Sequence, residues 1–254
     1  MRGSAPSSHL RSLVTDEYAE SAEYIDILIS PFWDDFGPVL ADAIKAIDPA
    51  GPVIDIGAGS GCGTLAIGDA LPMAEIFAVE PSAGLRSALL AKVNAHESLR
   101  DRVTVLPEGF LEAELPDRLG LVVAMNVIGH FSSAERRDIW KLLAERLAPG
   151  GRAVLNLQPP SEAVDIPEAL ASTGSIGRRR YECRARAEPT GDGTLTWHMT
   201  YRTYQGDDVV DQREVSYSWH LVAEPQLRDE LAQAGLRLHP LEPTDLGMYA
   251  ITRT

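Results

Sequence analysis

An acid followed by three glycines at alternate positions is the pattern in this chain most suited to binding a ligand. Asp55 lies in the short apolar run of residues 53–56, and glycines follow at positions 57, 59 and 61. Apolar residues at helical spacing resume from Leu65, so the pattern predicts a strand, a glycine loop and a helix in succession. Glycine permits positive φ and lets a ligand approach the main chain, and the start of the helix offers unpaired N–H groups.

Two common ligand classes do not fit this glycine loop. A phosphate-binding loop ending in Gly-Lys-Ser/Thr needs a lysine, and no lysine lies between Lys45 and Lys92. A dinucleotide fingerprint, Gly-x-Gly-x-x-Gly directly after the strand, would need a glycine where Cys62 stands. A tight turn without a ligand is the plain alternative, although so much glycine weakens a fold that does not use it.

The spacing Asp55-x-Gly57-x-Gly59-x-Gly61 resembles the first motif of the class I S-adenosylmethionine (SAM)-dependent methyltransferases. The resemblance implies a Rossmann-like fold, SAM as the cofactor and S-adenosylhomocysteine as its product. Asp55 is then the candidate to hold the ammonium of the methionine part, directly or through water. Its structural alternative is a buried acid on the N–H groups of the loop, and the two roles are compatible.

Further cofactor contacts are expected where the next strands end. Glu80 closes the second strand, where an acid can accept hydrogen bonds from both ribose hydroxyls. The family often has an acid after the third strand, but an alignment without gaps puts Gly109 there, so the pattern is not met. Phe110 is then either an adenine contact or a core residue, and Glu108 is a weaker substitute for the acid. The candidate cofactor-binding residues are Asp55, Gly57, Ala58, Gly59, Gly61, Glu80, Pro81, Phe110 and, where the fourth strand ends beneath the methionine part, Asn126.

Two residues are candidates for the acceptor side of the site. The segment Ile128-Gly129-His130 looks like the amino-sugar N-methyltransferases of antibiotic pathways, in which a histidine at the matching position lines the acceptor pocket. A lone histidine is otherwise usually structural. Residues 23–28, Glu-Tyr-Ile-Asp-Ile-Leu, also resemble that group, in which a tyrosine of a similar helix reaches the acceptor. His130 and Tyr24 are therefore the predicted catalytic residues, with Tyr18 as the competing tyrosine.

Alternating strands and helices must position these residues. Five apolar runs between 52 and 157 predict strands, and residues at helical spacing separate them. The sequence Ser-Ser-Ala-Glu at 132–135 is a capping box that opens one of the helices. The predicted fold class is α/β, a doubly wound and mostly parallel seven-stranded sheet with ligands at the carboxyl ends of its strands. Two amphipathic helices, within 13–30 and 38–47, form an N-terminal helical cap.

The pattern changes after the fifth strand. Three runs of alternating apolar and polar residues between 178 and 222 predict an inserted antiparallel three-stranded sheet. Its apolar face carries Trp197, Tyr201, Tyr217 and Trp219, which either line the acceptor pocket or pack on the core. The expected division is a disordered tail at 1–12, the helical cap at 13–50, a SAM-binding core at 51–160, an inserted lid at 161–224 and a return to the core at 225–254.

Composition and charge exclude several classes of partner. The chain has 254 residues, 44% of them hydrophobic and 24% charged, which is typical of a globular protein. A net charge of −14 argues against nucleic acid, because phosphate binding needs a basic face. The two cysteines give neither a disulfide framework nor a zinc site, and no cluster of metal ligands stands out. Without a membrane-length apolar run or a signal peptide, we expect a cytoplasmic protein with no membrane partner.

The expected function is in-line methyl transfer from SAM to a small-molecule acceptor, above all an amine of a secondary-metabolite pathway. O-methylation of a natural-product hydroxyl is the nearest alternative, and it would need a base or a metal. Methylation of a protein side chain and SAM binding without catalysis also remain open. The inserted sheet or the N-terminal helices could serve as the interface of a homo-oligomer.

Overall fold

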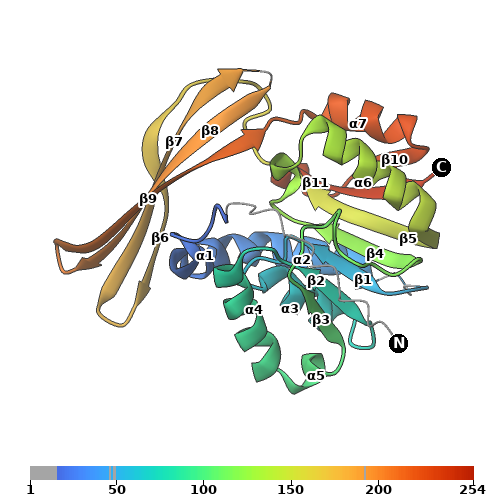
Figure 1. Ribbon diagram of the computed structural model, residues 1–254, viewed down its shortest axis with the longest axis horizontal. Coiled ribbons are helices and arrows are strands. Elements are labelled where there is room, and N and C mark those ends of the chain that lie inside the picture. Colours follow the sequence, from blue (N-terminus) through green and yellow to red (C-terminus); the bar gives the residue numbers. More distant parts are fainter. Residues whose placement is uncertain (1–15, 46, 48–49, 192) are drawn as a thin grey trace, which may run out of the picture.

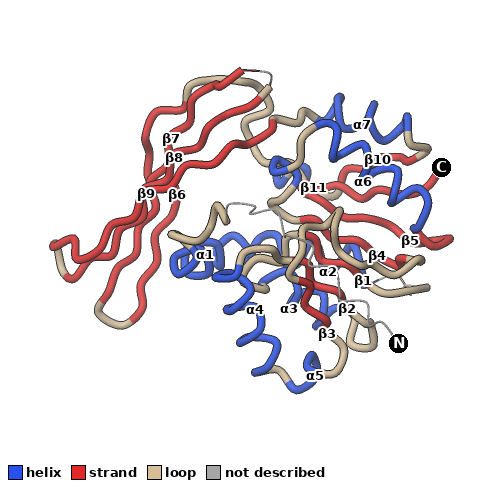
Figure 2. Tube along the Cα trace, viewed as in Figure 1, coloured by secondary structure: helices blue, strands red, loops and turns tan. Residues whose placement is uncertain are grey.

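The computed structural model describes residues 16–45, 47, 50–191 and 193–254, and the tail expected at 1–12 lies outside these residues. Two sheets make up the β structure (Figures 1 and 2). The larger has the strand order β10-β11-β5-β4-β1-β2-β3 and the smaller has the order β6-β7-β8-β9. The strands of the larger sheet are β1 (Val53–Ile56), β2 (Ile76–Val79), β3 (Val103–Leu106), β4 (Leu119–Ala124), β5 (Leu147–Asn156), β10 (Leu236–Pro240) and β11 (Met248–Arg253).

The larger sheet confirms the predicted doubly wound, mostly parallel, seven-stranded architecture. From β3 to β5 every neighbouring pair is parallel, and only β11 runs antiparallel to its neighbours β5 and β10. Strand β4 is buried along its whole length, as its unbroken apolar run requires when both faces of a sheet are covered. The helices are α1 (Ala22–Ile29), η1 (Ser30–Phe32), α2 (Trp33–Lys45), α3 (Cys62–Ala70), α4 (Ala83–Ala95), α5 (Glu97–Arg100), η2 (Ile128–His130), α6 (Ser133–Arg146), α7 (Glu224–Gln233) and η3 (Thr244–Leu246).

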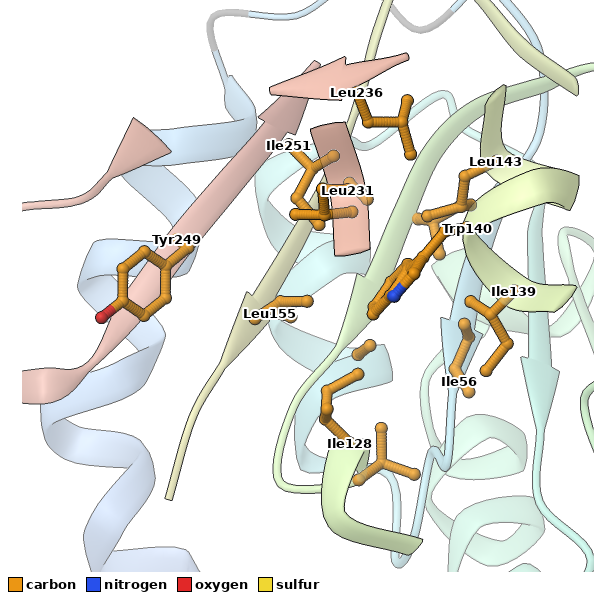
Figure 3. Packing of buried hydrophobic residues seen from close by; sticks show 14 of the residues in the cluster. Ile56, Ile128, Ile139, Trp140, Leu143, Leu155, Leu231, Leu236, Tyr249 and Ile251 are labelled. Atoms are coloured by element: carbon orange, nitrogen blue, oxygen red, sulfur yellow. The ribbon is translucent and has the colours of Figure 1, made fainter. Parts of the chain in front are cut away.

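Two apolar layers lie on opposite faces of the larger sheet. On one face, β1, β4, β5 and β11 pack against α6 and α7, where Trp140, Leu143 and Leu231 approach one another (Figure 3). On the other face, the alternate residues of the same strands pack against α2 and α3. Because neighbouring residues of a strand point to opposite faces, both layers follow from continuous apolar runs. The sheet is thereby fixed in the middle of the domain, and its strand ends are held rigidly.

The smaller sheet has four strands, one more than the sequence predicted. The expected strands are present as β7 (Arg179–Gly191), β8 (Thr194–Gln205) and β9 (Asp208–His220), and β6 (Ile166–Ile176) precedes them. The prediction of three strands was therefore wrong by one. The sequence of β6, IPEALASTGSI, has a proline, a glycine and few β-branched residues, and its pairing with β7 shifts register twice. Such a sequence is typical of an edge strand, and its strand pattern is weak.

Helix α1 lies beside the smaller sheet (Figure 1), whereas α2 packs on one face of the larger sheet. The second helix begins at Trp33, earlier than the expected start at Pro38, and contains that proline. Asp34 and Asp35 in its first turn favour the earlier start, because acids stabilise a helix N-terminus. Among the described residues, no helix is long and apolar enough to cross a membrane.

Candidate active site

The glycine loop forms the sharp turn between β1 and α3 that the sequence predicted. Gly57, Gly59 and Gly61 all have positive φ, at 64°, 57° and 97°. At Gly57 a side chain is excluded by space as well, since an added Cβ would lie 2.6 Å from Cγ2 of Val127. The loop therefore needs glycine both for its backbone and for the close packing of the chain that follows β4.

Asp55 is a buried acid with one side-chain hydrogen-bond donor. It is 2% exposed, and Thr64 Oγ1 donates to its Oδ2 over 2.6 Å. Burial raises the pKa of Asp55 to about 7, although the Thr64 hydrogen bond opposes the shift. Gly63 packs closely beside the carboxylate, because an added Cβ there would lie 3.3 Å from Oδ2 and 3.1 Å from the Trp33 ring. A buried carboxylate with so few donors fits a cationic ligand group, which would stabilise its charged form.

Glu80 joins the end of β2 to the glycine loop. Its Oε2 accepts the N–H of Gly59 over 2.7 Å, and its Oε1 accepts the N–H of Ser82 over 2.8 Å. Burial raises the pKa of Glu80, and these two N–H groups act in the opposite direction. Each oxygen keeps acceptor capacity, so the carboxylate fits a ribose diol as well as its structural role. The main-chain loop and the two buried acids together suit the ammonium and the ribose of SAM.

The other predicted cofactor residues differ in what the structure places around them. Ala58 is buried beneath α4, where it clusters with Leu89. Pro81 is exposed next to Glu80, and its carbonyl accepts from Arg86. Phe110 is 3% exposed within the main core cluster, which supports the core alternative for this residue.

Asn126 and Asn156 form a reciprocal pair at the carboxyl ends of β4 and β5. The N–H of Asn126 donates to Asn156 Oδ1 over 2.6 Å, and Asn156 Nδ2 donates to Asn126 Oδ1 over 2.7 Å. Among the described residues, Asn126 alone has positive φ without being glycine, at 55°. Asparagine enters this region more readily than most residues, and such strained positions cluster at functional sites. The pair thus fixes the direction of the chain where it leaves β4.

His130 lies in a polar and aromatic environment at the end of η2. Its Nε2 lies 2.9 Å from the hydroxyl of Tyr18, and its Nδ1 lies 3.5 Å from Oε2 of Glu17. The ring stands edge-on to Trp219, with centroids 4.9 Å apart, and also neighbours Tyr217. The side chain is 21% exposed. A partly exposed histidine with a hydroxyl at one ring nitrogen and a carboxylate at the other can take part in proton transfer.

Tyr24 lies in a different place from His130. It is fully buried between α1 and the smaller sheet, where it stacks on Tyr201 and donates to Asp211 Oδ2 over 2.6 Å. Burial and the bond to Asp211 raise its pKa to about 12. Of the two tyrosines that the sequence offered, Tyr18 is the one that the structure brings to the histidine.

The N-terminal segment connects the acceptor side to the cofactor side. Asp16 accepts a hydrogen bond from Ser82 Oγ over 3.0 Å, next to the residues that hold Glu80. Asp26 of α1 accepts from Ser60 Oγ of the glycine loop over 2.7 Å and forms an ion pair with Lys92 of α4. The segment 16–26 therefore contacts the glycine loop and the start of α4, and Glu17 and Tyr18 within it lie beside His130.

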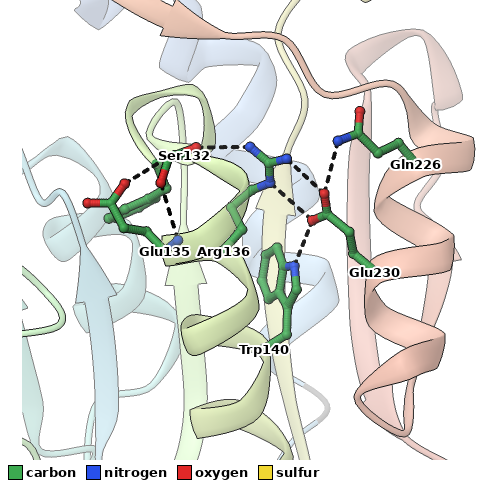
Figure 4. Close-up of polar contacts among 7 residues, drawn as sticks. Ser132, Glu135, Arg136, Trp140, Gln226 and Glu230 are labelled. Carbon is green, nitrogen blue, oxygen red and sulfur yellow. Dashed lines mark hydrogen bonds and ion pairs between the residues drawn. The ribbon is translucent and has the colours of Figure 1, made fainter. Parts of the chain in front are cut away.

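A buried ion pair supports the turn that carries His130. Arg136 is 1% exposed and donates to both oxygens of Glu230, and its Nη1 donates to the carbonyl of Phe131 (Figure 4). Trp140 Nε1 also donates to Glu230. The predicted capping box at Ser132 is confirmed beside this network. Helices α6 and α7 are thus tied to the residue directly after His130.

Aromatic residues of β9 close the other side of the turn. The Trp219 ring occupies the space where a side chain at Gly129 would stand. A small pocket opens beside it, lined by Ile128, Gly129, Asn156, Leu157, Gln158, Trp219, His220 and Val222. Of the four aromatic residues predicted to line the acceptor pocket or pack on the core, Tyr217 and Trp219 face His130, whereas Tyr201 packs on Tyr24.

The sequence analysis missed Asn156, Glu17 and Asp26. Asn156 had a signal, because it is a polar residue that ends an apolar run in the strand next to β4. Glu17 and Asp26 had none, since surface acids on a helical segment are common.

Comparison with known proteins supports the same interpretation. Residues 54–153 match the protein family described as "Methyltransferase domain", and no curated protein sequence matches the chain. The fold is similar to that of DesVI from Streptomyces venezuelae, with a TM-score of 0.71 at 16% identity over 92% of this chain and 94% of that one. It is also similar to SAM-bound CalS10, an amino pentose methyltransferase from Micromonospora echinaspora, with a TM-score of 0.69 at 17% identity over 87% and 92%. The sugar N-methyltransferase KedS8 from Streptoalloteichus sp. gives a TM-score of 0.63 at 17% identity over 100% and 98%.

The matched domain begins in β1 and ends in β5, so it contains the glycine loop, Glu80 and the His130 turn. A methyltransferase domain of this fold implies SAM as the methyl donor, as the first motif predicted. The chain thus contains a methyltransferase domain, residues 54–153, in a fold that it shares with solved SAM-dependent methyltransferases.

Proposed function

We propose that this methyltransferase transfers the methyl group of SAM to an amine nitrogen of a small molecule. The hydrogen bond between Tyr18 and His130, set among the aromatic rings of β9, carries the proposal. SAM supplies a methyl group already activated on a sulfonium, so the protein has to align the acceptor, exclude water and manage one proton.

An amine acceptor requires a proton-transfer step before it can be methylated. An alkylamine is mostly protonated at neutral pH and is nucleophilic only after it loses a proton. Burial is the main cause that raises the pKa of Tyr18 well above its usual value, and the nearby Tyr217 adds to it. The hydroxyl of Tyr18 therefore stays protonated and can donate a hydrogen bond. Donation from Tyr18 leaves Nε2 of His130 as the acceptor and assigns the ring proton to Nδ1, on the side of Glu17. The ammonium can then give its proton to the hydroxyl oxygen of Tyr18 while Tyr18 passes its own proton to Nε2 of His130, and Glu17 stabilises the imidazolium that forms.

The charge around the entrance favours a cationic acceptor. Asp16, Glu17 and Glu20 lie in the N-terminal segment, and the whole chain has a net charge of −14. Negative charge attracts an ammonium to the site, and aromatic faces such as those of Tyr217 and Trp219 stabilise a bound cation. An alcohol would gain from neither effect. The solved structures of similar fold include proteins described as an amino pentose methyltransferase and a sugar N-methyltransferase, which supports the same acceptor class.

The test begins with cofactor binding and proceeds to the acceptor. Calorimetric titration with S-adenosylhomocysteine and then SAM should give dissociation constants in the micromolar range. The enzyme is then incubated with SAM and matched pairs of acceptors. Each pair is an amino sugar and the same sugar with a hydroxyl in place of the amine, and mass spectrometry measures the masses of the products. We expect one methyl group to be added to amines and none to the hydroxyl partners. Methylation of the hydroxyl partner at an equal rate would overturn the proposal.

Two variants and one control test the residues. His130→Ala should lower turnover by about a hundredfold or more, the usual contribution of a general base. Tyr18→Phe should lower it as well, because the hydroxyl that orients the imidazole is lost. Tyr24→Phe is the matched control, since it also removes a tyrosine hydroxyl bonded to a partner, and it should leave turnover near that of the wild type. Full turnover in His130→Ala would remove the histidine from the mechanism.

A further inference from the structure

The turn after β4 links the two halves of the site through a backbone conformation that needs support. Asn126 has φ 55°, a region that side chains with a Cβ rarely adopt. The next residue, Val127, packs on Gly57 of the glycine loop, and the turn Ile128–His130 follows at once. Any change of φ at residue 126 therefore moves the contact with the cofactor loop and the histidine together.

Asn156 is placed to hold this conformation. It is 2% exposed and is the last residue of β5, a strand fixed on both sides by β4 and β11. Its amide oxygen accepts the backbone N–H of Asn126, and its amide nitrogen donates to the side-chain oxygen of Asn126. It also lines the small pocket next to Gly129 and Trp219. A side chain that donates and accepts in this way fixes the orientation of its partner.

We propose that Asn156 is a positioning residue that keeps Asn126 in the left-handed conformation, and thereby sets Val127 on the glycine loop and His130 at the acceptor. Asn156 acts on the site indirectly, through its two hydrogen bonds to Asn126. The part of this inference that concerns the acceptor rests on the proposed function, whereas the part that concerns the cofactor loop does not.

The test compares two substitutions of Asn156 in the full chain. Asn156→Ala removes both hydrogen bonds, and the turn is then free to relax. We expect affinity for S-adenosylhomocysteine to fall by about tenfold, because Val127 no longer presses on the loop. The imidazole resonances of His130, followed by NMR, should shift as its surroundings change. Asn156→Asp is the conservative variant: one oxygen still accepts the N–H of Asn126 and the other can accept from its side-chain amide, so it should retain much of both signals.

A matched control separates positioning from general stability. Val154→Ala lies two residues earlier in β5, is fully buried in the layer that faces α2 and α3, and truncates a side chain that makes no hydrogen bond. It should lower the melting temperature while leaving S-adenosylhomocysteine affinity and the His130 resonances as in the wild type. The inference would be overturned if Asn156→Ala kept S-adenosylhomocysteine affinity within about twofold of the wild type and left the His130 resonances in place, or if Asn156→Asp lost both signals as fully as Asn156→Ala. Neither readout needs turnover, so a failure to methylate amines would refute the proposed function and leave this result standing.

Discussion

Replacement of Asp55 by asparagine should stabilise the protein without ligand and weaken its binding of the cofactor. Burial raises the pKa of Asp55 to about 7, from 3.8 for an unperturbed aspartate. The folded state therefore holds the proton more tightly than the unfolded state between about pH 4 and pH 7. Stability contributed by this group is present at low pH and is lost as the pH rises through that window.

The size of the effect follows from the shift. A difference of about three pKa units corresponds to about 4 kcal/mol at pH 8, where the buried carboxylate is charged and has only Thr64 as a side-chain donor. Asparagine keeps an oxygen that can accept from Thr64 and removes the charge. The free energy of unfolding of Asp55→Asn should exceed that of the wild type by up to about 4 kcal/mol at pH 8, with little gain at pH 4.

The same carboxylate should make cofactor binding depend on pH. An ammonium next to Asp55 favours the charged form, so binding expels the proton in the window where the free protein is protonated. Affinity of the wild type for S-adenosylhomocysteine should rise by nearly tenfold per pH unit from pH 5 towards 7. It should level off above pH 7, where Asp55 is already charged in the free protein and the ammonium of the ligand is still protonated. Asp55→Asn should bind about tenfold to a hundredfold more weakly at pH 7.5, as expected for a lost charge-assisted hydrogen bond, and should show a flat profile.

Calorimetric titration with S-adenosylhomocysteine at several pH values measures the affinity. Urea unfolding without ligand measures the free energy of unfolding. Asp211→Asn makes the same change outside the cofactor site and should leave the affinity unaltered. A wild-type affinity that does not vary between pH 5 and 7, together with unchanged binding by Asp55→Asn, would refute this placement of the ammonium.

Three other substitutions probe the remaining supports of the site. Glu80→Ala should weaken S-adenosylhomocysteine binding by about tenfold to a hundredfold, the usual range for hydrogen bonds to a charged group. Unchanged affinity would show that the ribose does not bind at Glu80. Gly129→Ala should displace the ring of Trp219 and cost about 1–3 kcal/mol of stability, as overpacking does. Tryptophan fluorescence and thermal unfolding measure both effects, and an unaltered emission spectrum would contradict the contact. Glu230→Ala leaves Arg136 buried without its partner and should cost about 3–5 kcal/mol in urea unfolding, whereas a loss below 1 kcal/mol would show that water reaches the guanidinium.

Much of the fold could be predicted because its signals are local. Apolar runs, breaks at glycine and proline, and the capping box at Ser132 each depend on neighbouring residues, and the structure confirms the larger sheet and that cap. The fourth strand of the smaller sheet, Ile166–Ile176, escaped prediction because its residues have weak strand preference. Only pairing with β7 makes this segment a strand.

The candidate site also has one part that the sequence could indicate and one part that depends on tertiary structure. The cofactor side, from Asp55 to Glu80, is a continuous motif in which spacing along the chain fixes spacing in space, so the sequence alone was sufficient to indicate it. The proposed acceptor side combines the N-terminal segment, the η2 turn and β9, which are far apart in sequence and meet only in the tertiary structure. The sequence offered two tyrosines six positions apart. Packing of α1 on the smaller sheet buried Tyr24 and left Tyr18 at the histidine, and that choice depends on tertiary contacts that no local pattern encodes.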